Sequence, residues 1–353
     1  MAGRPTAAGG RPQDLSPPSG SRLAAMVRTR FAPSPTGSLH LGSALSAVVN
    51  RRRADWMLLR IDDTDAARNV AGGEEQLVRD LEWLGIVWND GPVRQSDRRE
   101  RYLEAAQALG DRFDGITLVR EDGRPTYHLA SVVDDVHYGI THVIRGNDHR
   151  PNEALHRRLH EALGTEPPEY IHHGLVLGPD GKKLSKRGHG VATVADLREQ
   201  GIPPEAVRAY LEELDLPRHD VHLDLPRIRR LAIDAIQSLS DEELAARAGA
   251  PPQLAPALRG ARDLVEARAM AAAILEPQPV SLPEEARPTL ERFVALRASG
   301  LDGKGIVREL KAVGGDLKAL RLALTGAERG PELWTVIAAL PQDEALRRVD
   351  AAL

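Results

Sequence analysis

Residues 26–190 alternate short apolar runs with longer stretches that repeat apolar residues at helical spacing. The short runs favour buried strands, and the longer amphipathic stretches favour helices. The runs predicted as strands are 27–31, 56–61 and 140–144. The predicted helices are 40–50, 74–84, 98–109 and 152–163. Strands that alternate with helices predict an α/β fold, a doubly wound parallel sheet of Rossmann type with helices on both faces.

The rest of the chain has a different pattern. Residues 191–245 show helical periodicity and predict a small helical connector. Residues 246–353 predict an all-helical C-terminal domain. Residues 1–25 are rich in Pro, Gly, Ala and Ser, which predicts a disordered tail.

The composition limits the kinds of site that this chain can build. It has no cysteine, which excludes disulfides and cysteine-ligated zinc, and its 12 histidines show no metal-ligand spacing. The formal net charge is -4, so any contact with nucleic acid must use local basic patches. No apolar run has the length of a membrane helix, and residues 1–25 lack the apolar centre of a signal peptide. These features predict a cytoplasmic protein with no zinc, no other protein-bound metal site and no membrane partner.

The sequence RFAPSPTGSLHLGS, at residues 30–43, connects the first predicted strand to a predicted helix. Pro35 and Gly37 are turn residues, and His40 stands at the start of the helix. In such a unit, backbone N–H groups and the positive end of the helix dipole point at an anion. The unit is therefore a candidate phosphate site, although a loop of this kind is more often only a turn.

A second candidate phosphate element, KKLSKR at residues 182–187, lies far downstream in a loop rich in glycine. Lys183 and Lys186 supply two ammonium groups that can close over phosphates, and Ser185 can add a hydroxyl donor. A lysine-rich loop on its own is ordinarily a solvated surface. Both elements in one chain point to ATP chemistry.

With both elements in this order, the chain resembles the class I aminoacyl-tRNA synthetases, whose two signature sequences are similar to PSPTGxxHxGx and KLSKR. The glutamyl branch is the most similar. The resemblance continues through LRIDDTD at 59–65, PTYHLASVVDD at 125–135 and HVIRGNDH at 142–149. Near the end, LRLALTGAERGPEL at 320–333 is similar to the anticodon-binding helical domain of the bacterial glutamyl enzyme. By this resemblance, 26–190 would bind ATP and glutamate, and 246–353 would be anticodon-binding-like.

The resemblance implies that glutamate is activated with ATP to glutamyl-adenylate and then transferred to the 3′ end of tRNA. His40, Lys183 and Lys186 would stabilise the charge that develops on the phosphates. Mg²⁺ is expected to bridge phosphate oxygens, held by ATP and water. The residues implied in binding ATP are Pro35, Gly37, His40, Gly42, Asp148, Lys183, Ser185 and Lys186.

The resemblance also implies a binding site for the amino acid. Arg145 would bind the side-chain carboxylate of glutamate, and Arg30 would also bind a carboxylate of the substrate. Asp62 would bind the ammonium group. Ser34 and Tyr127 would add hydrogen bonds. Without the resemblance, an arginine is more often in a surface salt bridge, and a tyrosine such as Tyr127 is as readily a core aromatic.

The clearest departure from the family lies between Tyr102 and Tyr127, where relatives insert a connective segment that grips the acceptor stem of tRNA. This chain has only a short segment there. Three interpretations remain: a compact synthetase that charges tRNA as a monomer, a paralogue that glutamylates a modified tRNA nucleoside, and a non-catalytic paralogue. Family members usually start just before the first strand, so Met26 is expected to be the initiator, and the alternative is a real flexible tail.

Overall fold

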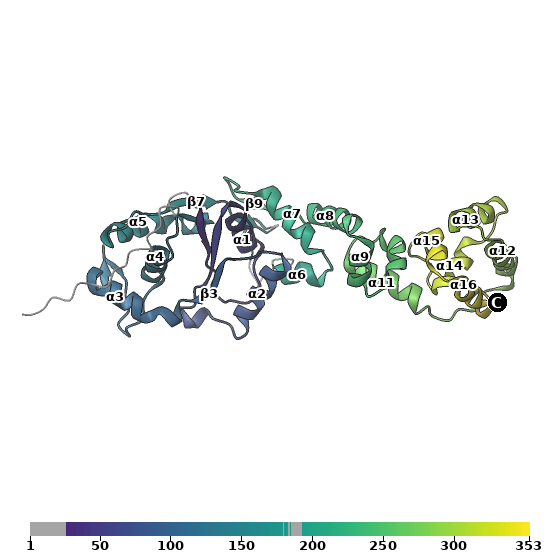
Figure 1. Cartoon of the computed structure of the whole chain (residues 1–353), viewed down its shortest axis with the longest axis horizontal. Helices are drawn as coiled ribbons and strands as arrows, with labels where there is room; N and C mark the ends of the chain where they lie inside the picture. Colours follow the sequence, from purple (N-terminus) through teal and green to yellow (C-terminus); the bar gives the residue numbers. More distant parts are fainter. Residues whose placement is uncertain (1–25, 179, 183, 185–192) are drawn as a thin grey trace, which may run out of the picture. The chain divides into compact units, whose positions relative to one another are not determined.

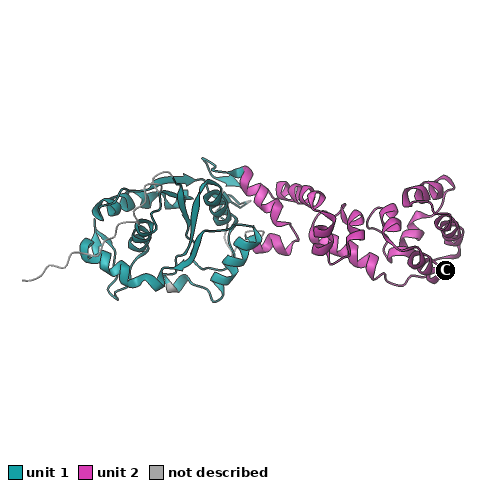
Figure 2. Cartoon of the chain, viewed as in Figure 1, with its two compact units in different colours: residues 1–194, 214–223 teal, residues 195–213, 224–353 magenta. Residues whose placement is uncertain are grey.

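The computed structural model describes residues 26–178, 180–182, 184 and 193–353. They form two compact units (Figure 1, Figure 2). The first runs to Val194 and includes Leu214–Leu223, and the second holds Ala195–Glu213 and Asp224–Leu353. The described strands all lie in the first unit, and they are β1 (Arg28–Phe31), β2 (Trp56–Ile61), β3 (Asp90–Arg94), β4 (Arg112–Phe113), β5 (Ile116–Thr117), β6 (His142–Gly146), β7 (Glu169–His173), β8 (Val176–Leu177) and β9 (Val221–His222).

Parallel strands form the centre of the first unit. β1, β2 and β3 make one parallel sheet in that order, and β6 pairs in parallel with β7. The start of β6 lies beside β1, because Thr141 N donates a hydrogen bond to the Arg28 carbonyl oxygen (2.9 Å). The spatial order is therefore β3, β2, β1, β6, β7, and the winding reverses between β1 and β6. This is the doubly wound arrangement that the sequence predicted.

Helices cover both faces of these strands. The larger ones are α1 (Leu41–Arg53), α2 (Gly73–Trp83), α3 (Arg99–Leu109), α4 (Tyr127–His137) and α5 (Glu153–Ala162). Neighbouring side chains of β7 contact different helices: His173 Nε2 lies 2.7 Å from Ser46 Oγ of α1, and His172 Nδ1 lies 3.5 Å from Glu153 of α5. Because side chains alternate along a strand, α1 and α5 lie on opposite faces.

Most elements of the first unit agree with the predicted ranges. β2 has the predicted bounds, and α1, α2, α3 and α5 differ by three residues or fewer at each end. β6 begins two residues later than predicted, because Ile140 N bonds back to the Asp135 carbonyl (2.9 Å) and ends α4. The pattern missed β3, which reads DGPVR, lacks an apolar run and has no buried residue. It also missed α4 and β7; valines and a serine weaken the helical signal of α4.

A β-hairpin occupies the place of the family's connective segment. β4 and β5 pair antiparallel, with Arg112 opposite Thr117 and Phe113 opposite Ile116. The two turn residues have positive φ, 48° at Asp114 and 78° at Gly115. Two residues in this conformation are typical of a tight hairpin turn, for which Asp-Gly is a favoured pair. The short segment is therefore a closed local structure.

The second unit is built from short helices around two hydrophobic cores. One core joins residues of 236–271 and the other joins residues of 254–352. The predicted boundary between residues 245 and 246 falls inside α9 (Asp241–Ala248), whose Leu244 and Ala248 pack in the first of these cores. The helices are α6 (Val194–Glu199), α7 (Pro204–Leu214), α8 (Leu225–Ser238), α9 (Asp241–Ala248), α10 (Ala255–Leu258), α11 (Leu264–Leu275), α12 (Arg287–Ala298), α13 (Gly303–Ala312), α14 (Leu317–Thr325), α15 (Leu333–Ala339) and α16 (Gln342–Ala352).

The stretch predicted as a connector, 191–245, is divided between the two units. Ala195–Glu213 and the residues from Asp224 onward belong to the second, whereas Leu214–Leu223 belongs to the first and pairs β9 in parallel with β8. The existence of a separate connector therefore stays a prediction. Among the described residues, no helix combines the length and the apolar character needed to cross a membrane.

Candidate active site

A cavity of about 790 Å³ lies where β1 and β6 end. Its wall includes residues that follow β1, the start of α1 and the residues that follow β6. In doubly wound folds, ligands bind at this place, outside the carboxyl ends of the strands where the winding reverses. The volume lies in the range of pockets for small-molecule ligands. The cavity is therefore the candidate active site.

The loop after β1 is held from behind by buried groups. Asp80 of α2 is fully buried, and its carboxylate accepts hydrogen bonds from Ser38 Oγ (2.6 Å) and Leu39 N (2.8 Å). Gly73, at the start of α2, approaches the loop so closely that an added Cβ would lie 2.4 Å from the Pro35 carbonyl oxygen. Asp80 and Gly73 thus fix the loop in place, and the pattern of the sequence did not single out either residue.

Most residues predicted to bind ATP line the cavity. Gly37, His40, Gly42 and Asp148 belong to its wall, whereas Pro35 is buried behind the loop and is not part of the wall. His40 directly precedes α1 and has an extended backbone (φ -67°, ψ 150°). The N–H groups of the first helical turn, which have no acceptor within the helix, therefore lie next to His40. The remaining three predictions, Lys183, Ser185 and Lys186, lie outside the described residues.

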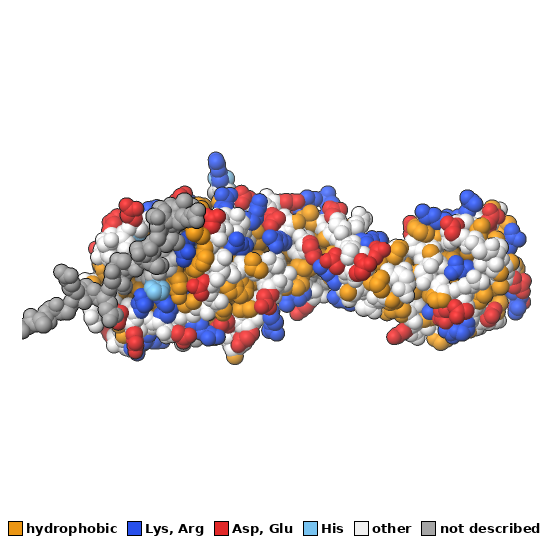
Figure 3. Space-filling model, in the orientation of Figure 1, with side chains coloured by type: hydrophobic (Ala, Val, Ile, Leu, Met, Phe, Trp, Pro, Cys, Tyr) orange, Lys and Arg blue, Asp and Glu red, His pale blue; other side chains and the backbone are white. Residues whose placement is uncertain are grey.

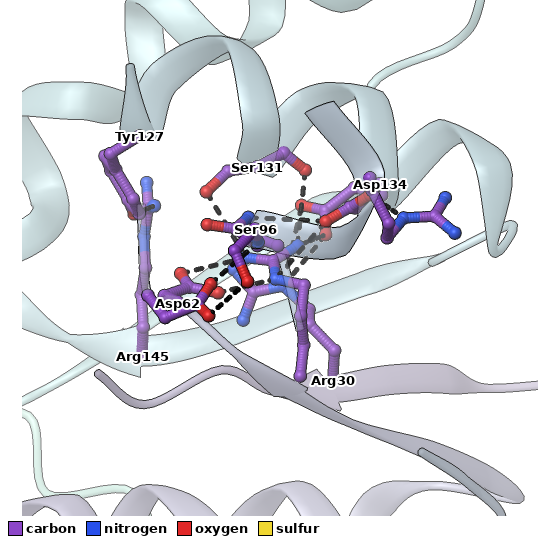
Figure 4. A network of polar contacts seen from close by, with 12 residues as sticks. Arg30, Asp62, Ser96, Tyr127, Ser131, Asp134 and Arg145 are labelled. Atoms are coloured by element: carbon purple, nitrogen blue, oxygen red, sulfur yellow. Dashed lines mark hydrogen bonds and ion pairs between the residues drawn. The ribbon is translucent and has the colours of Figure 1, made fainter. Parts of the chain in front are cut away.

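The residues predicted to bind the amino acid all line the same cavity: Arg30, Ser34, Asp62, Tyr127 and Arg145. They come from three strands or their ends and from α4, so the fold brings together residues that are far apart in sequence. In Figure 4, Arg145 lies beside Tyr127. The predicted grouping therefore exists as one wall, and the roles of its members stay predictions.

Arg145 is a buried cation whose hydrogen-bond partners and ring contact are neutral groups. Its side chain donates from Nε to His172 Nε2 (3.3 Å) and from Nη1 to Tyr127 Oη (3.4 Å), and it lies over the Tyr170 ring (5.2 Å). Within the described residues, Arg145 Nη2 is buried without a hydrogen-bond partner, and no carboxylate is within ion-pair distance of the guanidinium. Burial lowers the pKa of Arg145. A guanidinium in this setting is well placed to bind an anionic ligand.

Arg60, which the sequence did not single out, is the centre of a buried network at the floor of the cavity. Its guanidinium contacts both oxygens of Asp62 (2.7 and 3.2 Å), and its Nη1 donates to Asp135 (3.2 Å). Asp135 also accepts from Arg30 Nε (3.2 Å). Burial raises the pKa of Asp62, and the charge of Arg60 opposes that effect. Asp62 is thus held in one orientation by Arg60.

The network continues away from the cavity through Asp134. This buried carboxylate accepts hydrogen bonds from Arg98 Nε (2.8 Å), Tyr102 Oη (2.9 Å) and Gln95 Nε2 (3.3 Å). The charges of the network balance, because Asp62, Asp134 and Asp135 face Arg30, Arg60 and Arg98. Arg145 is outside this balance. Two features of the sequence could have indicated this network: the arginine within the apolar strand WMLLRI and the two aspartates at the end of LASVVDD. Charged residues in buried segments need partners of opposite charge.

The doubly wound sheet, with a cavity where its winding reverses, assigns the first unit to the nucleotide-binding α/β folds. Residues 26–112 and 110–223 match the family model for the catalytic domain of tRNA synthetases class I (E and Q), where E and Q stand for glutamate and glutamine. The chain belongs to this family. The predicted family and fold class are therefore confirmed.

Proteins similar to this chain include two curated relatives and one solved structure. The chain is 34% identical to glutamate–tRNA ligase 1 of Rubrobacter xylanophilus over 94% of this chain and 98% of that protein. It is 30% identical to a glutamate–tRNA ligase of Akkermansia muciniphila, over 92% and 98% respectively. The crystal structure of a glutamate tRNA ligase from Elizabethkingia meningosepticum in complex with its amino acid has the same fold, with a TM-score of 0.71, 23% identity, and coverage of 93% and 99%.

The alignment with the Rubrobacter protein shows that this chain is the shorter of the two. It spans 434 positions, more than the 353 residues of this chain, although it covers nearly all of both proteins. The relative therefore carries internal segments that this chain lacks.

Proposed function

We propose that the protein is a glutamate–tRNA ligase, which activates glutamate with ATP and transfers the glutamyl group to the 3′ end of tRNA. The observation that carries the choice of amino acid is Arg145, a buried guanidinium with neutral neighbours and one buried nitrogen to spare. The side-chain carboxylate of glutamate would bind to Arg145 and neutralise its charge. Glutamine would leave the buried cation uncompensated, which is costly in a site removed from water.

The chemistry requires positioning and charge stabilisation, without a general base. The α-carboxylate of glutamate attacks the α-phosphorus of ATP, the bond to the β-phosphate oxygen breaks, and pyrophosphate leaves. Arg30 and Asp62 would orient the carboxylate and the ammonium group, and His40 and the first turn of α1 would face the phosphates. Lys183, Ser185 and Lys186 are proposed, from the sequence, to complete the phosphate contacts. A terminal hydroxyl of tRNA then attacks the acyl carbon and AMP leaves.

Mg²⁺ is proposed to bind together with ATP. The described residues include no group of three His, Cys, Asp or Glu side chains placed to hold a metal ion, and Asp62 is already bonded to Arg60. Phosphate oxygens and water would therefore supply the ligands, which suits an ion that keeps several waters. It would neutralise part of the phosphate charge.

Gly42 tests the proposed ATP contact of α1. An added Cβ would meet Val176 only at 4.0 Å, so Gly42→Ala should fold as well as the parent, and alanine favours the helix. The methyl group would nevertheless project at the cavity wall, and we expect the KM for ATP to rise about tenfold or more. Gly260→Ala, where an added Cβ meets nothing within 4 Å, is the matched control. An unchanged KM for ATP in Gly42→Ala would remove Gly42 from the ATP site.

Contacts with tRNA are proposed to involve α13 of the second unit. Lys304, Arg308 and Lys311 are exposed on one side of this helix, whereas Ile306 and Leu310 are buried on the other. On the face shown in Figure 3, basic and acidic side chains are interspersed, so a local cluster of cations is the available phosphate-binding feature. The commoner alternative for such charges is a solvated helix face.

Reversing these three charges to glutamate should weaken tRNA binding and reduce its dependence on salt. Each lost phosphate contact should lower the slope of log affinity against log salt by about one. Adenylate formation should change little, because the substitutions lie outside the cavity. Arg347→Glu, a reversal at an exposed arginine of α16, is the control. Equal salt slopes in the triple variant and the parent would assign α13 to the solvated surface.

A second candidate function is glutamylation of a modified nucleoside within tRNA, which the short β4–β5 hairpin favours because no large connective segment grips the acceptor stem. The two functions differ in the site of the ester. Labelled glutamate should be joined to intact tRNA and not to tRNA that lacks its terminal adenosine. Label on the shortened tRNA would select the nucleoside-modifying function instead.

A further inference from the structure

The wall behind Arg145 is a stack of rings that holds the cation without neutralising it. Tyr170 of β7 presents one ring contact to Arg145 (5.2 Å) and another to Arg157 of α5 (4.9 Å). His172, two residues further along β7, stacks near Tyr170 at 6.5 Å with an interplanar angle of 11°. Aromatic faces attract a cation but leave its N–H groups available for other acceptors.

The contact between Arg145 and His172 fixes the position of the histidine proton. A guanidinium can only donate, so His172 Nε2 must accept the hydrogen bond from Arg145 Nε (3.3 Å) and carries no proton. In the neutral ring, the proton then sits on Nδ1, which faces Glu153 Oε2 at 3.5 Å. Burial and the nearby Arg145 lower the pKa of His172 to about 4, so the ring is neutral at pH 7.

Glu153 connects this histidine to α5. One of its oxygens faces His172, and the other accepts from Arg157 Nη2 (2.7 Å) and Nε (2.8 Å) one helical turn further on. The charged and titratable groups that face His172 are Arg145, Arg150, His149 and Glu153. Glu153 is the single acid among them. The chain from α5 to the cavity is thus Glu153, His172, Arg145.

We propose that His172, held by Glu153, is a positioning residue that orients Arg145 so that its Nη2 meets the side-chain carboxylate of the substrate. This inference rests on the proposed function and adds what holds the Arg145 guanidinium in its orientation. A neutral acceptor suits the task, because a carboxylate in place of His172 would neutralise Arg145 and a protonated ring would repel it. The structure thereby keeps the arginine both fixed and charged.

The test compares two substitutions in the full-length protein. His172→Gln keeps an acceptor near the position of Nε2, whereas His172→Phe keeps a ring and removes the acceptor. In pyrophosphate exchange with tRNA present, we expect the phenylalanine variant to raise the KM for glutamate about tenfold and to leave the KM for ATP nearly unchanged, because an acceptor for a charged donor is lost. The glutamine variant should stay close to the parent. Glu153→Ala should act in the same direction as His172→Phe, by a smaller factor.

Equal increases in both KM values, an unchanged KM for glutamate, or no recovery in the glutamine variant would each overturn the positioning role. Failure of the proposed function would be seen in the parent protein, as an absence of any exchange with glutamate. Failure of the positioning role would be seen only in the variants, while the parent stays active. A second measurement, made on the parent protein, is the ¹⁵N spectrum of His172, whose signals are assigned by their loss in His172→Gln. A proton on Nδ1 at pH 7 supports the inference, and a proton on Nε2 contradicts it.

Discussion

Arg145→Ala is expected to raise the KM for glutamate by about one to two orders of magnitude and to leave the KM for ATP nearly unchanged. A charged hydrogen bond contributes about 1.5–3 kcal/mol, and 1.4 kcal/mol corresponds to a factor of ten. The loss of affinity should affect glutamate and not ATP, because Arg145 bonds to Tyr127 and His172 and to no residue of the loop between β1 and α1. Steady-state pyrophosphate exchange, with each substrate varied in turn, measures both constants.

The control for Arg145→Ala is Arg158→Ala. Arg158 is an arginine of α5 that is half-exposed and pairs with Asp114 in the β4–β5 turn, away from the cavity wall. Its loss removes one positive charge from the same unit and should leave both KM values unchanged. A comparable rise in the KM for ATP in Arg145→Ala would show that Arg145 serves the nucleotide, or that the cavity as a whole has changed shape.

Arg60→Leu is expected to have the largest effect on stability. Its side chain is about 1% exposed and pairs with Asp62 and Asp135, so its removal leaves buried carboxylates without their cation. Removing one partner of a buried ion pair costs about 3–5 kcal/mol. Denaturant unfolding followed by tryptophan fluorescence can measure this in the first unit, which contains Trp56, Trp83 and Trp88.

The background for this measurement is Trp334→Phe, which removes the tryptophan signal of the second unit. Arg158→Ala, at a half-exposed pair with Asp114 in the same unit, provides the comparison and should not shift the transition measurably. An Arg60→Leu protein that unfolds at the same denaturant concentration as the background would mean that the network does not hold the first unit together.

The fold could be predicted from the sequence where the signal is local. The apolar run of β2 and the amphipathic periods of α2, α3 and α5 each lie in one continuous segment, so their bounds follow from the pattern alone. β3 could not be found in this way, because it has no apolar run and is defined by its pairing with β2. Tertiary contacts decide such elements, and a single sequence does not contain them in readable form.

The candidate site divides in the same way. The residues implied by the family resemblance, such as Arg145 and Gly42, were located at the cavity wall, because they lie within motifs. The residues that hold them, such as Arg60, Asp80 and His172, were not assigned a role. Each has a partner that is distant in sequence: Asp80 bonds to Leu39, His172 bonds to Arg145, and Arg60 bonds to Asp135 as well as to its near neighbour Asp62. A supporting role of this kind is defined by a contact between elements, and only the folded chain shows it.

Glutamate-dependent activation is measured most directly by amino-acid-dependent exchange of pyrophosphate into ATP by the full-length protein, with Mg²⁺ and tRNA present. We expect exchange with glutamate and, at equal concentration, a rate lower by about tenfold or more with glutamine, because glutamine leaves Arg145 uncompensated. Lys186→Ala should abolish most of the exchange if the sequence correctly places that lysine at the phosphates. No exchange with glutamate above a blank without amino acid would exclude the ligase function, and equal exchange with glutamine would exclude Arg145 as the group that selects glutamate.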